Sequence, residues 1–264
     1  MKLRLHLFAI AIACTVGCKN PDDNSLNIFS LADDIELGNQ VSGEIASNPA
    51  EYPVLDSIQY ADAYAYVNNI RNKILNGGNV FYKDEFVWDM YIINDDATVN
   101  AFCTPGGYIY IYTGLLKYLE SEDQLAGVMG HEMAHADRRH TTDQLTKAYG
   151  VEFLISILLS GSAVDYAALA ANIAFLEFSR ENETEADEYS VIYLCPTDYN
   201  AAGSAGFFIK LIEDGQTGDV PVFFSTHPDP GNRIENINAE KVEQGCIGSA
   251  TYDQAYQDFL ASLP

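Results

Sequence analysis

The chain has 264 residues, enough to bury one sizeable core, and its 48% hydrophobic and 20% charged residues are ordinary for a globular protein. Its charge balance is not ordinary, because 14 Lys and Arg residues oppose 38 Asp and Glu residues and give a formal net charge of −24. A surface this acidic repels nucleic acids and anionic lipid headgroups, so neither is expected as a ligand bound through charge.

The first residues have the pattern of a bacterial lipoprotein signal. Two basic residues precede an apolar stretch, residues 5–16, that is too short to be a comfortable transmembrane helix. Small residues then lead to Cys18, which resembles the cysteine that becomes the lipidated first residue of a mature lipoprotein. We therefore expect a signal peptide over residues 1–17, lipidation of Cys18 and a polar tether over residues 18–29. A plain secretory signal with an incidental cysteine is the alternative.

This anchor predicts the compartment. We expect the mature protein in the cell envelope, on the outer membrane facing the periplasm, with the cell surface as the alternative, and we expect membrane contact only through the lipid anchor. Disulfides are allowed outside the cytoplasm. Cys195 and Cys246 each lie beside a turn residue, so they are the candidate disulfide, and free thiols are the alternative.

Residues 30–264 are expected to form a single domain of the α+β class, predominantly helical with one small sheet. Apolar periodicity and capping signals predict the helices. Their expected ranges are 31–46, 61–75, from a Ser121 cap to near Arg139, 174–194, 201–213, 232–242 and 252–260, with helical sequence also following Gly114. Aromatic and β-branched residues predict strands at 86–93, 101–103 and 108–112, with a turn between the last two.

Two stretches carry more specific structural signals. Ser121-Glu122-Asp123-Gln124 has the form of a capping box for the central helix. Residues 151–178 are strongly apolar, but Asp165 and Glu177 limit the uncharged runs to about a dozen residues, short of the ~20 that span a bilayer. We expect a helical pair there that is buried or covers the functional site, with contact to a membrane surface as the alternative.

The central helix carries His131-Glu132-Met133-Ala134-His135. Two histidines four residues apart leave the same face of a helix one turn apart, so both imidazoles can reach one Zn²⁺ at roughly 2.0–2.1 Å. Glu132 projects toward the edge of such a metal, where it can act as general base on the attacking water. The cap and the amphipathic helix around the motif favour this interpretation over the alternative of two solvent-facing or core histidines.

A catalytic zinc ion needs a third protein ligand, and the acidic segment 179–187 supplies carboxylates. Glu183 and Asp187 are four residues apart and share a helix face. One can bind the metal while the other accepts a hydrogen bond from a ligating histidine. Spacing alone leaves Glu181, Glu183 and Glu185 open as the ligand, and a solvated helix face is the alternative.

The His-Glu-x-x-His motif, Ser179-Arg180 and Glu183-x-Glu185-Ala186-Asp187 together resemble the metallopeptidase family of HtpX, BepA, OMA-type proteases and type I CAAX prenyl proteases. The resemblance implies a zincin-like metallopeptidase domain with a small sheet or hairpin beside the active-site helix. It also implies one zinc ion per chain, held by His131, His135 and Glu183, with Asp187 as the hydrogen-bond partner of a ligand.

The resemblance extends to both sides of these motifs. Asn100-Ala101-Phe102 and Pro105-Gly106-Gly107 resemble the family's edge strand and turn, and Thr226-His227-Pro228 with Arg233-Ile234 resembles its late motif. An extended substrate peptide would lie beside residues 101–103. The residues implied in substrate binding are Asn100, Ala101, Phe102, Gly106 and Gly107. Cys103 departs from the small apolar residue usual in the family.

Two late residues are further catalytic candidates. His227 is expected either to stabilise the transition state or to occupy the open zinc position as a self-inhibiting latch, and a loop histidine stacked on Pro228 is the alternative. His227 or Arg233 could donate a hydrogen bond to the tetrahedral oxyanion. His140 lies near a helix C-terminus, where a cation is favourable, and receives no further role.

The expected function is therefore a zinc-dependent endopeptidase with Glu132 as general base and polypeptides as substrates, in particular unfolded or damaged envelope proteins. The sequence does not specify protein partners. One alternative is a binding or chaperone-like lipoprotein with a structural zinc ion, although such sites are usually closed and rich in cysteine. The other is a zinc hydrolase that acts on a non-peptide substrate such as a cell-wall amide.

Overall fold

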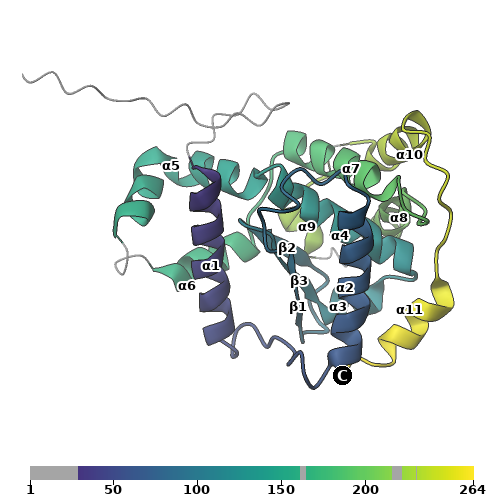
Figure 1. Cartoon of the computed structure of the whole chain (residues 1–264), viewed down its shortest axis with the longest axis horizontal. Helices are drawn as coiled ribbons and strands as arrows, with labels where there is room; N and C mark the ends of the chain where they lie inside the picture. The colour runs from purple at the N-terminus through teal and green to yellow at the C-terminus, as the bar shows by residue number, and fades with distance from the viewer. Residues whose placement is uncertain (1–28, 161–164, 216–221, 230) are drawn as a thin grey trace, which may run out of the picture.

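The computed structural model describes residues 29–160, 165–215, 222–229 and 231–264. The predicted signal peptide, the predicted lipidation site Cys18 and residues 19–28 of the tether lie outside the described residues. The fold is α+β and predominantly helical, which confirms the predicted class (Figure 1). Phe29, the last residue of the predicted tether, is buried and packs in the folded domain.

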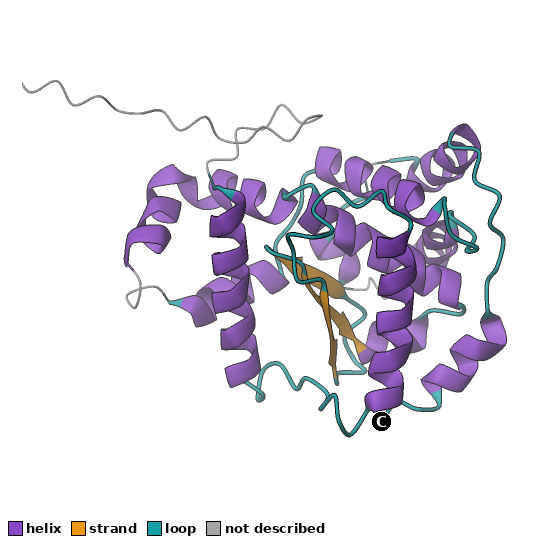
Figure 2. Cartoon of the chain, viewed as in Figure 1, coloured by secondary structure: helices purple, strands orange, loops and turns teal. Residues whose placement is uncertain are grey.

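A three-stranded sheet lies among the helices (Figure 2). It consists of β1 (Asp89–Ile93), β2 (Ala101–Thr104) and β3 (Tyr108–Tyr112) in the order β1-β3-β2. Strand β3 pairs parallel with β1 and antiparallel with β2, so β2 is an edge strand. The tight turn between β2 and β3 uses Gly106 (φ 79°) and Gly107 (φ 89°), a backbone conformation that favours glycine.

The first strand begins three residues later than the predicted range of 86–93. Trp88 has a φ of 52°, which interrupts the extended backbone just before Asp89. Ahead of this interruption, Val87 donates its N–H to the carbonyl of Gly106. The aromatic composition of the segment therefore reflects burial in the core as well as strand structure.

The helices surround this sheet. In chain order they are α1 (Leu31–Ser47), α2 (Ala61–Asn76), α3 (Thr113–Tyr118), α4 (Glu122–Asp137), α5 (His140–Ser160), α6 (Tyr166–Ala174), α7 (Arg180–Leu194), α8 (Gly203–Gly215), α9 (Phe223–Thr226), α10 (Arg233–Glu243) and α11 (Asp253–Leu260). The predicted ranges of α1, α2, α4, α8, α10 and α11 are confirmed to within three residues at each end.

The two faces of the sheet pack against different helices. The tyrosines of β3 point toward α1 and α6, whereas Ile109 and Ile111 point toward α2, α4 and α7. This alternation is the period-two pattern of a strand that is buried on both faces. It places α4, the helix of the His-Glu-x-x-His motif, in the main core beside β2.

The predicted helix over residues 174–194 is wrong at its start. Helix α6 ends at Ala174, and α7 begins only at Arg180, where the hydroxyl of Ser179 accepts the N–H of Asn182 and caps the helix. Between the two helices, Phe178 donates its N–H to the carbonyl of Thr226 (3.1 Å). This non-helical segment, residues 175–179, is therefore fixed to the end of α9, a short helix where the sequence predicted only a loop.

The apolar stretch of residues 151–178 forms the later part of α5, all of α6 and the segment after it. Gly150 (φ 79°, ψ 159°) kinks α5. Leu169 and Ile173 of α6 are buried against α1, so α6 fits the expected buried helix. Among the described residues, no helix is long and apolar enough to cross a membrane.

The predicted capping box at Ser121 is wrong in its hydrogen bonds. Ser121 does precede α4, but its hydroxyl donates to the carboxylate of Asp123. The Gln124 side chain accepts the N–H of Glu120 instead of returning to Ser121. A capping box that the sequence analysis missed begins α1, where Ser30 and Asp33 exchange their side-chain and backbone hydrogen bonds.

The structure joins Cys195, just after α7, to Cys246, just after α10, in a disulfide. The disulfide links two positions that are 51 residues apart in the sequence. Cys103 of β2 is buried and forms no disulfide within the described part of the chain.

Candidate metal centre

Helices α4 and α7 cross closely, and this crossing positions three of the candidate ligands. A Cβ atom added to Gly130 of α4 would lie only 3.0 Å from the Ser190 hydroxyl of α7, and that hydroxyl donates to the carbonyl of Gly127 (2.8 Å). The small residues of α4 therefore let α7 approach. Consequently Glu183, on the first turn of α7, meets the histidine face of α4.

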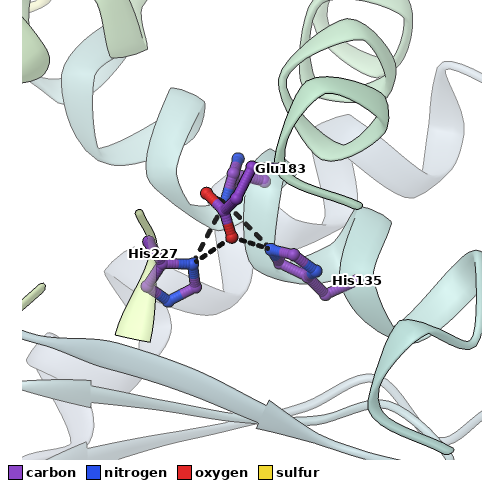
Figure 3. Close-up of side chains that lie close together, drawn as sticks. His135, Glu183 and His227 are labelled. Atoms are coloured by element: carbon purple, nitrogen blue, oxygen red, sulfur yellow. Dashed lines mark hydrogen bonds and ion pairs between the residues drawn. The ribbon is translucent and has the colours of Figure 1, made fainter. Parts of the chain in front are cut away.

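Four buried side chains converge on one point: His131, His135, Glu183 and His227, each at most 1% exposed. Figure 3 shows His135, Glu183 and His227 turned toward one another. The Nε2 atoms of His131 and His135 lie 3.0 Å apart. Glu183 Oε1 lies 3.3 Å from His135 Nε2 and 3.0 Å from His227 Nδ1. His227 Nδ1 in turn lies 3.4 Å from His131 Nε2.

These separations fit a tetrahedral metal site. Ligands that bind zinc at about 2.0–2.1 Å in a tetrahedron are separated by roughly 3.3–3.4 Å, close to the spacing of the four ligand atoms here. The donor set of three imidazoles and one carboxylate also suits zinc. The residues that converge include the three predicted ligands, and Nδ1 of His227 is the fourth atom that could hold a metal ion.

The electrostatics of the cluster favour a cation. Burial disfavours the charged imidazole, but the carboxylates of Glu183 and Asp187 raise the pKa of His131 to about 10. Burial opposes ionisation of Glu183 as well, yet the adjacent His227 and His131 hold its pKa well below the usual range. Burial and the charge of His131 lower the pKa of His135 well below its usual range, so this ring stays neutral, and the ionised Glu183 supplies negative charge beside it.

Asp187 lies one helical turn beyond Glu183 and faces His131. Its Oδ1 lies 2.9 Å from His131 Nδ1, the ring nitrogen that faces away from the cluster. Arg233 holds Asp187 with two hydrogen bonds, of 3.0 Å from Nε and 2.7 Å from Nη2, and its Nη2 also reaches Glu183 (3.3 Å). The Nη1 atom of Arg233 has no hydrogen-bond partner among the described residues, and its predicted oxyanion role stays a prediction.

Glu132 is fully buried beside the cluster, and neither of its carboxylate oxygens has a hydrogen-bond partner in the described ranges. Burial raises its pKa, and the charge of Glu183 adds to this effect, although His227 and His131 act in the opposite direction. A buried carboxylate that accepts no hydrogen bond is costly, so it indicates a chemical role more than a structural one.

His227 and Phe178 cover the cluster. His227 follows α9 and stacks on Phe223 with ring centroids 4.3 Å apart. Its Nε2 has no hydrogen-bond partner among the residues described, and the nearest charged atom is Glu132 Oε1 at 3.5 Å. Phe178 stacks on the ring of His135 with a centroid separation of 3.8 Å. The alternative expectation for His227 was stacking on Pro228, and the stacking partner found in the structure is Phe223.

The residues predicted to bind substrate have different surroundings. The Asn100 carbonyl accepts the N–H of Tyr112, so by alternation the backbone groups of Ala101 and Cys103 face the unpaired side of β2. The Asn100 side chain also accepts a hydrogen bond from Thr226, next to His227 (3.4 Å). The Phe102 ring stacks on Tyr110, on the opposite face of the sheet from α4.

Gly106 and Gly107 have a structural explanation. A Cβ atom on Gly106 would lie 3.2 Å from Ile35 Cα in α1, and one on Gly107 would lie 3.1 Å from the backbone nitrogen of Trp88. Together with their positive φ angles, these close contacts require glycine in the turn. Their predicted contact with substrate stays a prediction.

Three residues lie behind His135 in positions that the sequence did not predict. His140 Nδ1 lies 3.0 Å from His135 Nδ1, and His140 Nε2 lies 3.2 Å from Glu185 Oε2. Arg138 donates from Nε to the other oxygen of Glu185 (2.6 Å). Burial opposes ionisation of Glu185, but His140 and Arg138 lower its pKa. The only local signal was the position of His140, five residues after His135.

A model of Peptidase family M48 matches residues 64–241 of this chain. Metalloprotease LoiP of Escherichia coli is 28% identical over 257 residues, which cover 90% of this chain and 96% of that protein. Mitochondrial metalloendopeptidase OMA1 of Arabidopsis thaliana is 34% identical over 163 residues, and the β-barrel assembly-enhancing protease of Escherichia coli is 30% identical over 183 residues. These matches cover 61% and 64% of this chain but only 33% and 37% of those two relatives.

Proposed function

Because the chain belongs to peptidase family M48, we propose that it is a zinc-dependent metalloendopeptidase that cleaves polypeptides in the bacterial cell envelope. The observation that carries this proposal is the convergence of His131, His135 and Glu183 beside the Glu132 carboxylate, whose oxygens have no hydrogen-bond partner among the described residues. Structural zinc sites are usually closed sets rich in cysteine and have no such carboxylate. The arrangement therefore favours catalysis over a purely structural metal.

The chain's own residues divide the work of hydrolysis. Bound zinc supplies a Lewis acid that activates water near neutral pH and polarises the scissile carbonyl. Glu132 accepts the proton of the attacking water and delivers it to the leaving amine. Its burial supports this role, because a raised pKa brings a carboxyl group closer to the proton affinity that such a transfer needs.

His227 is the fourth member of the cluster, and we propose that it closes the site in the resting enzyme. The support is its position: its Nδ1 lies among the ligand atoms while its ring is stacked on Phe223. A bound zinc ion would need one position free for substrate, and His227 would then have to move away before catalysis. Once displaced, His227 could still donate a hydrogen bond to the oxyanion.

The proposed substrate site is the unpaired side of β2. Ala101 and Cys103 are 0% and 2% exposed, so the residues that cover this edge must move aside before an extended peptide can hydrogen-bond to their backbone groups as an added strand. Recognition of this kind reads the backbone more than the sequence, which suits unfolded or damaged proteins. One of the relatives is named for the assembly of β-barrels, and another is named a mitochondrial metalloendopeptidase. A lipid anchor at Cys18 would place this chain in the cell envelope.

Casein digestion by the zinc-loaded protein tests the proposal. We expect cleavage that chelators abolish, and we expect Glu132→Gln to keep about one zinc ion per chain while activity falls by roughly 10²–10⁴-fold. The matched control is Gln124→Glu, the reverse substitution at another position of the same helix. Zinc-loaded wild-type protein that cleaves no peptide would instead support a binding protein.

A further inference from the structure

The ring nitrogens of His131 and His135 that face away from the metal cluster have different partners. His131 Nδ1 lies 2.9 Å from the carboxylate of Asp187, which Arg233 holds. His135 Nδ1 meets a second imidazole, that of His140, at 3.0 Å. A carboxylate appears only one step further on, at Glu185, which Arg138 holds. The arrangement behind His135 is unusual, and it restricts which ring nitrogens of His135 and His140 can carry a proton.

The constraint follows from which atoms can donate. His135 Nε2 lies 3.0–3.3 Å from two other ligand atoms, so it must keep its lone pair free to bind a metal. Its proton then resides on Nδ1 and is donated to His140 Nδ1. His140 must accept there, so its own proton is on Nε2, and it points at Glu185 Oε2. A carboxylate that only accepts ends the chain, and every group is satisfied.

Buried contacts of the preceding residue, Arg139, also fix the backbone at His140. Arg139, between α4 and α5, has a φ of 63°, and this left-handed turn folds His140 back toward His135. Arg139 is itself buried and pairs with Asp34 of α1, and its Nη2 donates to the carbonyl of Phe29 (2.6 Å). A non-glycine residue in this conformation is strained and persists only where its surroundings hold it.

We propose that His140 is a positioning residue for the metal ligand His135: it accepts the Nδ1–H of His135, donates to Glu185, and so fixes the tautomer and ring orientation that present His135 Nε2 to the metal. The inference rests on the proposed metal site and adds a residue to it. Hydrogen-bond partners of metal ligands typically contribute 10–100-fold to metal affinity.

The first test is the zinc affinity of variants, measured by competition with a chromophoric chelator. His140→Phe keeps a ring but removes the acceptor, and we expect its zinc dissociation constant to rise about 10–100-fold. His140→Asn places an amide oxygen near the position of Nδ1, so it should recover most of the loss. The matched control is Thr141→Val, a neighbouring buried residue of the same helix, which should bind zinc as the wild type does.

The second test needs no variant. Long-range ¹H–¹⁵N correlation spectra of zinc-loaded wild-type protein with ¹⁵N-labelled histidine report which ring nitrogen carries each proton. We expect His135 with its proton on Nδ1 and His140 with its proton on Nε2. A His140 protonated on Nδ1 would overturn the proposal, even if His140→Phe fails to fold.

The remaining outcomes separate the two proposals. Wild-type protein that binds no zinc would end the proposed function. Wild-type protein that binds zinc no more tightly than His140→Phe would leave that function standing and overturn the role of His140. Equal losses in His140→Asn and His140→Phe would do the same, because the acceptor would then not be the feature that matters.

Discussion

The four side chains of the candidate metal site come from two regions that hold them differently. His131, His135 and Glu183 lie on the packed helices α4 and α7, and each has a buried partner behind it: Asp187, His140 or Arg233. His227 lies at the end of the four-residue helix α9, and its Nε2 has no hydrogen-bond partner among the described residues. Three candidate ligands thus have a polar partner behind them, whereas the ring of the fourth is stacked on Phe223.

The difference separates metal retention from substrate access. A catalytic metal site keeps three protein ligands and frees one position for substrate. If the helical ligands provide the affinity, His227 can leave without loss of the metal. Changes to the helical region should therefore reduce zinc binding far more than changes to His227.

The largest loss is expected for Glu183→Ala. The substitution removes a ligand and also leaves the charged Arg233 without one of its carboxylate partners. We expect zinc content near zero after dialysis and casein cleavage at the level of chelator-treated wild type. The control is Glu181→Ala on the exposed side of the same helix turn, which should retain both properties. Full zinc content in Glu183→Ala would contradict the assignment of the third ligand.

A smaller loss is expected for Asp187→Asn. The amide keeps the shape of the side chain but removes the charge that orients His131 and pairs with Arg233. We expect zinc affinity to fall about 10–100-fold, with full occupancy regained at higher zinc concentration. Chelator competition measures this directly. A wild-type affinity would show that Asp187 stabilises only the fold.

The same two regions mark where sequence reasoning succeeded and where it failed. His131 and His135 share one helix, so their spacing predicts their geometry without knowledge of the rest of the fold. Glu183 lies 48 positions beyond His135, and spacing alone left three glutamates open; only the family resemblance selected one. The α+β class and the sheet followed from local periodicity in the same way.

What the sequence could not predict depends on long-range contacts. His140 reaches His135 only because Arg139 adopts a left-handed conformation that Asp34, more than a hundred residues earlier, helps to hold. The break between α6 and α7 depends similarly on the contact of Phe178 with Thr226. Neither the arginine at 139 nor the phenylalanine at 178 signals a break in a helix, since basic and apolar residues are common inside helices.

The smallest loss of zinc is expected for His227→Ala. We expect zinc content near one per chain, because the three helical ligands and their partners remain. Activity, in contrast, should change. If His227 closes the site in nine of ten resting molecules, its removal should raise kcat/KM about tenfold, because the competent state becomes fully populated. If His227 also donates to the oxyanion, kcat should fall by roughly 10²–10³-fold.

Separate measurement of kcat and KM on a quenched fluorescent peptide distinguishes these effects, because closure acts on the free enzyme and the oxyanion contact acts on the bound complex. The matched comparison is Phe223→Leu, which removes the stacking surface but keeps the imidazole. It should weaken closure and therefore raise kcat/KM without a loss in kcat. Unchanged kinetics in His227→Ala would remove both roles, and loss of zinc would place His227 among the ligands that retain the metal.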